Sequence, residues 1–270
     1  MAEHSRRKRV VYFDAQILMG NKTGIGYYFE RLLTEWADER PDLLFVGHTF
    51  NFRSKKTLRL PEKPNISLVN NSFIPIQLVN LLRRFHIEIP IEILIFRKPK
   101  AAIFPNFLTA PSLFHAPMTS FIYDLTFKDH PEYMSAKNLK DLTRFIPTTI
   151  RRSSQVITIS DFSAGRLTHY FPEAKTKLRV VPVPPPDDTP PSALALQPRL
   201  NALGITPRKY ILFIGTIEPR KNIENLIVAY TKLPENVRGR FSLVLAGGSG
   251  WRDETITANL RNATTAGYNI

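Results

Sequence analysis

The sequence predicts an α/β protein with parallel sheets, in which one complete doubly wound domain is followed by part of a second. Apolar segments alternate with amphipathic helical segments through the first two thirds of the 270 residues, a pattern typical of a parallel sheet with helices on both faces. A proline-rich segment then interrupts the alternation, and the same alternation restarts near residue 208.

The first domain is predicted to span residues 1–182. Apolar residues between Ile25 and Trp36 recur at helical spacing and predict a helix with one buried stripe. The predicted strands are short runs of mainly apolar residues: Val10–Phe13, Leu44–Phe50, Ile66–Val69, Ala101–Phe104, Thr119–Tyr123, Gln155–Ile159 and Leu178–Val183.

Two further helices complete the first domain. One is predicted over Lys137–Arg152, where Pro147 is expected to kink or split it because proline lacks the backbone N–H. The other is predicted over Phe162–Phe171, with Ser160 or Asp161 at its N-cap.

Residues 183–207 are predicted to be a proline-rich linker. Its part PVPPPDDTPP, at 182–191, should be stiff and extended, because it cannot form a helix or a central strand. Residues 208–270 then predict a partial second domain. Its elements are strand Tyr210–Ile214, helix Asn222–Leu233, strand Phe241–Leu245 and a helical stretch from about Trp251.

Two parallel strands leave both sheet edges unpaired, and a doubly wound domain needs several more. We therefore expect the second domain to be truncated, with an edge that a partner chain or a second copy could complete. The alternative is a small α/β cap on the first domain, which the loop-like Ala246–Gly248 disfavours.

Composition narrows the function classes. With no cysteine, the chain has neither disulfides nor thiolate metal sites, which fits a reducing cytoplasm. The net charge of +14 favours polyanions, and in the absence of an RNA-binding or zinc-finger signature we expect nucleotide diphosphates or anionic lipid rather than nucleic acid. No run approaches the ~18–20 apolar residues that span a bilayer.

Two segments at the ends of strands suit an anionic ligand. The glycines of Gly20–Gly26 allow a ligand close to the backbone at the positive end of the next helix, although such turns also serve packing alone. In GTIEPRKN at 215–222, Arg220 and Lys221 fall at a helix N-terminus, where they oppose the helix dipole. An anion explains this pair better than local stability does, the alternative being a solvated charged turn.

Tyr123 and Asp124 form a third candidate, because they end the predicted strand Thr119–Tyr123. Polar groups just beyond a strand tip often face a ligand. Asp124 could equally cap the following turn.

Five segments together resemble the retaining glycosyltransferases of family 4, which have the GT-B fold. They are DAQ-x7-GIGYYFERLL, IYDLTFKDHPEYMS, QVITISDFSAGRL, FIGTIEPRKNIENLIVAY and LVLAGGSGW, in the family's order and spacing. The resemblance covers nearly the whole chain, and GTIEPRKN is its most specific part.

This resemblance implies two Rossmann-like domains around a cleft, with a nucleotide-diphosphate sugar bound by the second domain and the acceptor by the first. It implies metal-independent transfer with retention of configuration, and no cofactor. Arg220 and Lys221 would stabilise the leaving diphosphate, close to Gly215 and Thr216. The resemblance places the glycines Gly24 and Gly26 near the diphosphate or the acceptor, and Asn106 and Ser160 on the acceptor side of the cleft.

Two departures from the family pattern affect these expectations. Tyr123 stands where many members have a histidine that contacts the donor sugar, and tyrosine is a poor base near neutral pH. The carboxylate pair that closes the family's donor site, Glu-x7-Glu, is absent from these 270 residues, so we expect the chain alone to have little or no transferase activity.

The predicted function is therefore transfer of a hexose, with mannose as one candidate, to a polysaccharide or glycolipid acceptor. The alternative is a non-catalytic acceptor-binding subunit that needs a partner chain to complete the donor site. A Rossmann dehydrogenase is disfavoured, since no GxGxxG follows the first strand. The basic, apolar segment Ile74–Phe104 could contact an anionic membrane from the cytoplasmic side, or IEIPIEILIF within it could be buried.

Overall fold

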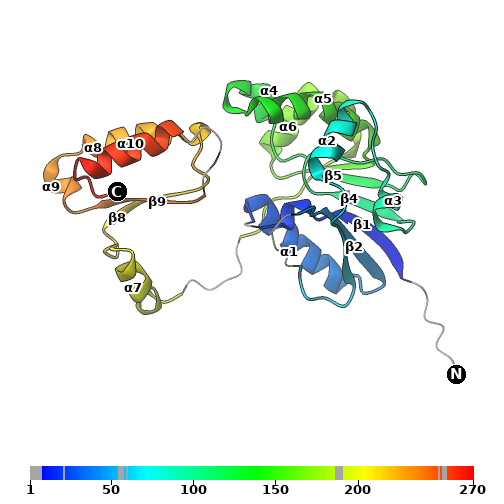
Figure 1. Cartoon of the computed structure of the whole chain (residues 1–270), viewed down its shortest axis with the longest axis horizontal. Helices are drawn as coiled ribbons and strands as arrows, with labels where there is room; N and C mark the ends of the chain where they lie inside the picture. The colour runs from blue at the N-terminus through cyan, green and yellow to red at the C-terminus, as the bar shows by residue number, and fades with distance from the viewer. Residues whose placement is uncertain are drawn as a thin grey trace. The chain divides into compact units, whose positions relative to one another are not determined.

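The computed structural model describes residues 8–20, 22–53, 58, 60–185, 191–248, 250 and 254–270. The chain divides into two compact units, Met1–Pro184 and Pro185–Ile270. Both units combine parallel strands with helices (Figure 1), which confirms the predicted α/β class. Half of the proline-rich segment 182–191, at 186–190, and the expected helix start at Trp251 lie outside the described residues.

The first unit is built on a seven-stranded sheet in which all neighbouring strands are parallel. Its order is β3-β2-β1-β4-β5-β6-β7, so the direction of winding reverses between β1 and β4. The strands are β1 (Arg9–Asp14), β2 (Leu43–Phe50), β3 (Ile66–Asn71), β4 (Ala101–Phe104), β5 (Met118–Phe121), β6 (Gln155–Thr158) and β7 (Leu178–Val180).

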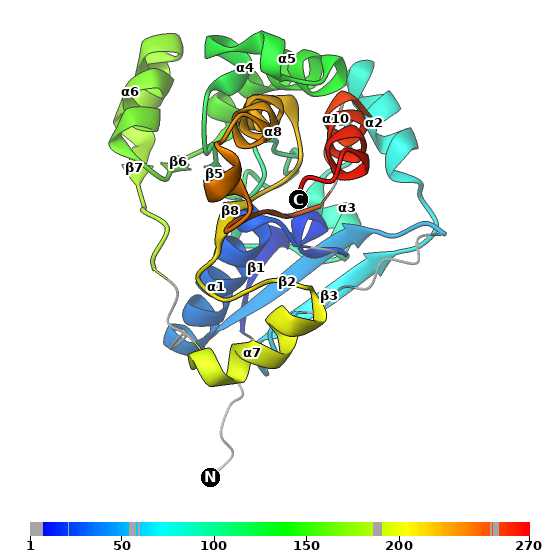
Figure 2. The ribbon, with the colours of Figure 1, turned by 90° about the vertical axis from the view of Figure 1, so that its left-hand side faces the viewer.

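Helices cover both faces of this sheet because successive side chains of each strand point to opposite faces. Phe13 of β1 packs on Phe29 of α1, whereas its neighbour Tyr12 packs on the other face, in a cluster with Ile91 and Ile95 of α3. Figure 2 shows α1 and α3 on opposite sides of β1. The α-helices are α1 (Gly24–Glu39), α2 (Ile76–Arg84), α3 (Ile91–Ile95), α4 (Thr126–Asp129), α5 (Ala136–Arg152) and α6 (Asp161–Tyr170).

Two local features of this unit bear on the predictions. Of the two outcomes expected at Pro147, a kink or a split, the split does not occur, because α5 runs through it from Ala136 to Arg152. The buried Ile146 and Ile150 on either side hold the helix against the core. Strand β5 ends at Phe121, two residues earlier than predicted, so Tyr123 follows the strand instead of ending it. The N-cap prediction is confirmed, since the Ser160 side chain accepts a hydrogen bond from the Ser163 N–H.

The second unit contains the parallel strands β8 (Tyr210–Ile214) and β9 (Ser242–Ala246). Helices α8 (Ile223–Thr231) and α10 (Glu254–Thr265) cover one face of this pair, around the buried Ile227, Tyr230 and Leu243. A short helix, α9 (Glu235–Arg238), lies between them in sequence. Three apolar side chains of β8 are exposed: Ile211, Leu212 and Ile214.

The segment predicted as an extended linker, 183–207, contains a helix. Helix α7 spans Ala193–Ala202, begins after the N-cap Ser192 and includes Pro198. Alanine and leucine are strong helix formers, and here they outweigh the single proline. The prediction of a linker did not include this helix.

Candidate functional site

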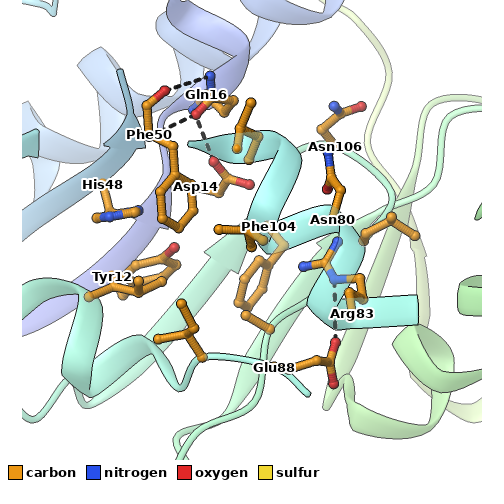
Figure 3. Close-up of a pocket in the computed structure, with 16 residues that line it drawn as sticks. Tyr12, Asp14, Gln16, His48, Phe50, Asn80, Arg83, Glu88, Phe104 and Asn106 are labelled. Carbon is orange, nitrogen blue, oxygen red and sulfur yellow. Dashed lines mark hydrogen bonds and ion pairs between the residues drawn. The ribbon is translucent and has the colours of Figure 1, made fainter. Parts of the chain in front are cut away.

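A cavity opens where the winding of the sheet reverses, at the carboxyl ends of β1 and β4. In open α/β sheets this point is the usual ligand position, because the helices that follow the two strands leave on opposite faces. The cavity has a volume of about 250 Å³. Asp14 at the end of β1 and Asn106 just beyond β4 both line it (Figure 3).

The strand side of the cavity is held by hydrogen bonds between neighbouring segments. Asp14 Oδ1 accepts from the Gln16 N–H at 2.9 Å, which fixes the turn after β1. The Gln16 side chain in turn bonds the main chain of Phe50 at the end of β2. Burial raises the pKa of Asp14, an effect that its hydrogen bond from Gln16 and the nearby Arg83 oppose.

Two aromatic residues behind Asp14 are almost fully buried. Burial raises the pKa of Tyr12, so its phenol stays protonated. His48 is 2% exposed, its Nε2 has no hydrogen-bond partner within the described residues, and burial lowers its pKa to about 4. His48 is therefore neutral near pH 7. Its ring lies edge to face with the ring of Phe50, and the two ring centroids are 4.6 Å apart.

The opposite side of the cavity comes from α2, which supplies Asn80 and Arg83. Arg83 Nε lies 3.5 Å from Glu88 Oε1, and Arg152 binds the other carboxylate oxygen of Glu88. A single carboxylate thus lies against two guanidinium groups, and the buried Nε of Arg83 makes no hydrogen bond with the described residues. Figure 3 shows Asp14 on the strand side and Arg83 on the helix side of the same space.

The two predicted glycines at the start of α1 differ in their surroundings. A Cβ on Gly26 would lie 2.9 Å from the Ile17 carbonyl oxygen, so packing alone requires glycine there. A Cβ on Gly24 would have nothing within 4 Å. The N-cap Thr23 makes no side-chain cap hydrogen bond, so its hydroxyl does not occupy the first amides of α1. Asn21, within the predicted glycine-rich segment, lies outside the described residues.

Tyr123, predicted to lie at a strand tip, is buried. It is 6% exposed, and its hydroxyl donates to the Pro105 carbonyl at 2.7 Å. Burial raises the pKa of Tyr123 above its usual value, so its phenol stays protonated. Its ring packs among Tyr28, Phe107 and Phe121, and the position so close behind β5 explains this burial.

Asp124 and Ser160 both serve as local caps. Asp124 is exposed, and its carboxylate accepts from the Thr126 N–H at 3.0 Å, which was the alternative considered for it. Asp124 also lines a second hollow, between α4 and α6, which the Asp129–Arg166 ion pair borders. Ser160 caps α6 and lines neither cavity.

In the second unit, Arg220 and Lys221 are exposed in a 3-10 turn, Pro219–Lys221, that precedes α8. Asn222 separates this turn from the helix with a left-handed backbone, φ 55°, so the two cations stand just outside α8. Arg220 forms an ion pair with Glu218, whose side chain is 11% exposed. This ion pair gives Arg220 a local partner that the sequence prediction did not include.

The loops after β8 and β9 touch through their backbones. Gly215 has φ 151°, a conformation that favours glycine. A Cβ on Gly247 would lie 1.8 Å from the Gly215 carbonyl oxygen, so no side chain fits there. The Ile217 N–H donates to the Gly248 carbonyl at 2.9 Å. Thr216, which was predicted to bind the donor diphosphate, is exposed and lies between Gly215 and Ile217 in the loop.

Several cavity residues were not predicted as site residues: Asp14, Gln16, His48, Asn80 and Arg83. They come from three separate parts of the sequence, around residues 14–16, 48 and 80–83. One sequence feature could have indicated Asp14 as a site residue, namely its position at the end of the first predicted strand. Among the described residues there is no cluster of three or more metal-ligating side chains, and none of the described helices is long and apolar enough to span a membrane.

Residues 201–263 match the family model described as "Glycosyl transferases group 1". The O-antigen chain mannosyltransferase B of Escherichia coli is 29% identical over 165 residues, which cover 61% of this chain and 43% of that protein. The serotype-specific mannosyltransferase WbdA of Escherichia coli is 52% identical over 40 residues, or 15% of this chain and 5% of that protein. The chain thus spans less than half the length of these curated relatives.

Solved structures show a similar architecture. WaaG, a glycosyltransferase involved in lipopolysaccharide biosynthesis, aligns with a TM-score of 0.60 and 14% identity, over 96% of this chain and 68% of its own. Anabaena Alr3699/HepE, solved in complex with UDP and glucose, aligns with a TM-score of 0.58 and 13% identity, over 97% of this chain and 67% of its own. At such identities the likeness concerns the fold alone.

Proposed function

We propose that this chain, which has the GT-B glycosyltransferase fold, transfers a hexose from a nucleotide-diphosphate sugar to a saccharide acceptor. The observation that carries the proposal is the match of residues 201–263 to group 1 glycosyl transferases, because this segment includes GTIEPRKN. The likeness to two mannosyltransferases favours mannose as the sugar, and a polysaccharide or glycolipid as the acceptor. Retention of configuration follows from the resemblance to family 4.

In this proposal Arg220 and Lys221 bind the donor diphosphate and stabilise its charge as it leaves. Lys221 is exposed and, within the described residues, forms no ion pair, so its ammonium is available to an anion. The first amides of α8 add further donors, since Asn222 makes no side-chain cap hydrogen bond. Gly215 and Thr216 bring the backbone of the same loop close to the ligand, and no metal ion is required. That this loop faces the glycine turn at Gly24 stays a prediction.

We also propose that residues 1–270 alone bind the donor only in the millimolar range. The described part of the second unit supplies two strands, and the family's carboxylate pair is not among these residues. The diphosphate contacts at Arg220 and Lys221 would then provide most of the affinity.

Titration of GDP-mannose and UDP-glucose against the chain, followed by NMR, tests both statements. We expect millimolar binding that Arg220→Ala and Lys221→Ala each weaken several-fold, whereas Lys209→Ala, a lysine outside the loop, leaves it unchanged. Binding that none of the loop variants alters would contradict the diphosphate site. Micromolar binding by the chain alone would contradict the proposal of low affinity.

The exposed face of β8 favours a second candidate function, an acceptor-binding subunit completed by another chain. Ile214 is 74% exposed, and Leu212, two residues earlier on the same face of the strand, is also exposed. An apolar strand face of this kind is normally covered. Sedimentation of the wild-type chain and of Ile214→Ser at increasing protein concentration tests this candidate. Association that rises with concentration in the wild type and is lost in the variant supports a second copy of the chain as the partner.

Peripheral membrane contact on the cytoplasmic side is proposed for the surface around α2. Phe73, Leu78, Leu81, Phe85 and Ile87 are exposed there, close in sequence to the basic Arg84. The neighbouring segment IEIPIEILIF does not take part in full, because Ile91, Leu94 and Ile95 are buried in α3. Vesicle sedimentation with anionic and neutral lipids tests this contact, which Phe85→Ser should weaken.

A further inference from the structure

The loop that carries Arg220 is fixed at Ile217 by the backbone of the loop after β9. The Ile217 N–H donates to the Gly248 carbonyl at 2.9 Å, and the Ile217 carbonyl accepts from the Gly250 N–H at 2.9 Å. The Ile217 side chain packs against the buried cluster of the second unit. Both main-chain groups and the side chain of Ile217 are therefore held, three positions before Arg220.

Gly250 also limits the space around Glu218. A Cβ on Gly250 would lie 2.5 Å from the Ile217 carbonyl oxygen and 3.0 Å from the Glu218 Cβ, so no side chain fits at position 250 without a shift of the backbone. The Glu218 side chain is 11% exposed. Close packing of this kind leaves a side chain few conformations, so the two loops together determine where the Glu218 carboxylate lies.

The Glu218 carboxylate has one side-chain partner in the described part of the chain, the guanidinium of Arg220. Nη2 of Arg220 donates to Glu218 Oε1. Pro219 joins the two residues, and its ring fixes its own backbone angle φ. The Glu218 carbonyl accepts from the Lys221 N–H at 3.0 Å, which closes the turn beneath the ion pair. The guanidinium of Arg220 is therefore held where the two loops place Glu218.

Local stability does not account for this ion pair. A carboxylate that leaves water loses its hydration, and a partner that is 39% exposed compensates for this only in part. Solvent also screens the attraction between the two groups, so that pairs with an exposed partner stabilise a fold little. The burial of Glu218 is better explained by its effect on the orientation of Arg220.

Most of the Arg220 guanidinium stays available to a ligand. A guanidinium has five N–H donors in one plane, and the described residues engage one of them, through Glu218. When one donor of the plane is held, the others point in fixed directions, which suits two oxygens of a phosphate. Lys221 differs, because its exposed ammonium supplies charge without a fixed direction.

We propose that Glu218 is a positioning residue for the donor diphosphate, because it holds the Arg220 guanidinium in the orientation that binds phosphate oxygens. Glu218 does not touch the donor itself. The inference rests on the proposed function, since it names the residue that orients one of the two diphosphate-binding cations. It also makes the loop after β9 part of the donor site, although its contact with Arg220 passes through Ile217 and Glu218.

Two variants at one position separate orientation from charge. Glu218→Gln and Glu218→Ala both remove the negative charge, but only glutamine keeps an oxygen that accepts from Arg220. GDP is titrated against the full 270-residue chain and followed by NMR. We expect Glu218→Ala to bind GDP about fivefold more weakly than Glu218→Gln, equivalent to ~1 kcal/mol, because a free arginine must be ordered on binding. Equal affinities of the two variants overturn the proposal.

The Nε–H signal of Arg220 gives a second readout that needs no ligand. A held guanidinium gives a sharp signal, which we expect in the wild type and in Glu218→Gln and expect to be lost in Glu218→Ala. The same sharp signal in Glu218→Ala would overturn the proposal. Glu235→Ala, which removes an exposed glutamate on α9, is the matched control and should leave both the signal and the GDP affinity unchanged.

If Glu218→Ala does not fold, Glu218→Asp carries the test. Aspartate keeps the charge of the wild type, but its side chain is shorter by one methylene, so the carboxylate no longer reaches the guanidinium in the same position. We expect GDP to bind several-fold more weakly to Glu218→Asp than to the wild type. Equal binding by these two proteins overturns the role of Glu218.

This inference and the proposed function fail in different ways. GDP binding that depends on Arg220, with equal affinities of Glu218→Gln and Glu218→Ala, would remove only the role of Glu218. Absence of any Arg220-dependent GDP binding in the wild type would remove the diphosphate site, and the role of Glu218 in donor binding with it.

Discussion

The side-chain amide of Gln16 bonds both main-chain groups of Phe50. Its Oε1 accepts from the Phe50 N–H at 3.0 Å, and its Nε2 donates to the Phe50 carbonyl at 3.4 Å. The ends of β1 and β2 are thereby tied together next to the cavity, although 34 residues separate the two partners in sequence. The position of the Phe50 ring depends on this contact.

Gln16→Ala should lower the free energy of unfolding by about 1–3 kcal/mol, because the Phe50 main chain loses both partners. Urea denaturation followed by circular dichroism measures the change. Gln77→Ala, on the exposed side of α2, is the matched control and should change stability by less than about 0.5 kcal/mol. Equal effects of the two substitutions would show that the contact contributes nothing.

The glycines of α1 provide a matched pair. Gly26→Ala should destabilise the fold by about 1–3 kcal/mol, because its Cβ would collide with the Ile17 carbonyl. Gly24→Ala should be neutral or stabilise by up to about 1 kcal/mol, since the site is open and alanine favours helices. Thermal unfolding of both variants checks this. A destabilised Gly24→Ala would mean that its glycine serves the fold rather than a ligand.

Tyr123→Phe separates a structural from a catalytic role. The variant leaves the Pro105 carbonyl without its donor, so we expect a loss of about 1 kcal/mol in unfolding free energy. Nucleotide-sugar titration of the variant should match that of the wild type. Unchanged stability with weakened donor binding would restore the sequence-based hypothesis that Tyr123 contacts the donor.

Burial of neutral His48 should make stability depend on pH. The folded pKa of about 4 lies below the usual 6.5, so the unfolded chain binds the proton more readily between these values. Protonation of His48 does not reduce the free energy of unfolding above pH 6.5. As the pH falls from 6.5 toward 4, it lowers that free energy by about 3 kcal/mol in total.

Urea unfolding of wild type and His48→Phe between pH 7 and 4 measures this contribution. The wild type should lose more stability than the variant over that range. Asp14, whose pKa shift acts in the opposite direction, is present in both proteins and cancels in the difference. Parallel pH profiles would contradict a buried neutral histidine.

The elements of the first unit could be predicted because each strand and helix carries its own apolar pattern. Strand β4 lies where the sequence predicted it, over Ala101–Phe104. Helix α7 was missed because the linker over 183–207 was predicted from the proline run at 182–191, which ends before the alanines and leucines of the helix. The left-handed turn at Asn222 was missed because a charged turn and a helix start look alike in sequence.

The candidate site was predicted less well. Its residues Asp14, His48, Arg83 and Asn106 are brought together only by the crossing of strands and helices. Tyr123 was misplaced because a shift of two residues in the end of β5 moves a side chain from a rim into the core. Neither the assembly of the cavity residues nor the burial of Tyr123 follows from the spacing of residues along the chain.

The contact between Gly215 and Gly247 means that the loops after β8 and β9 cannot vary independently. Any side chain at position 247 would push the two strand ends apart, and with them the segment that presents Arg220 and Lys221. Redesign of sugar preference by grafting loops would therefore have to exchange both as one cassette.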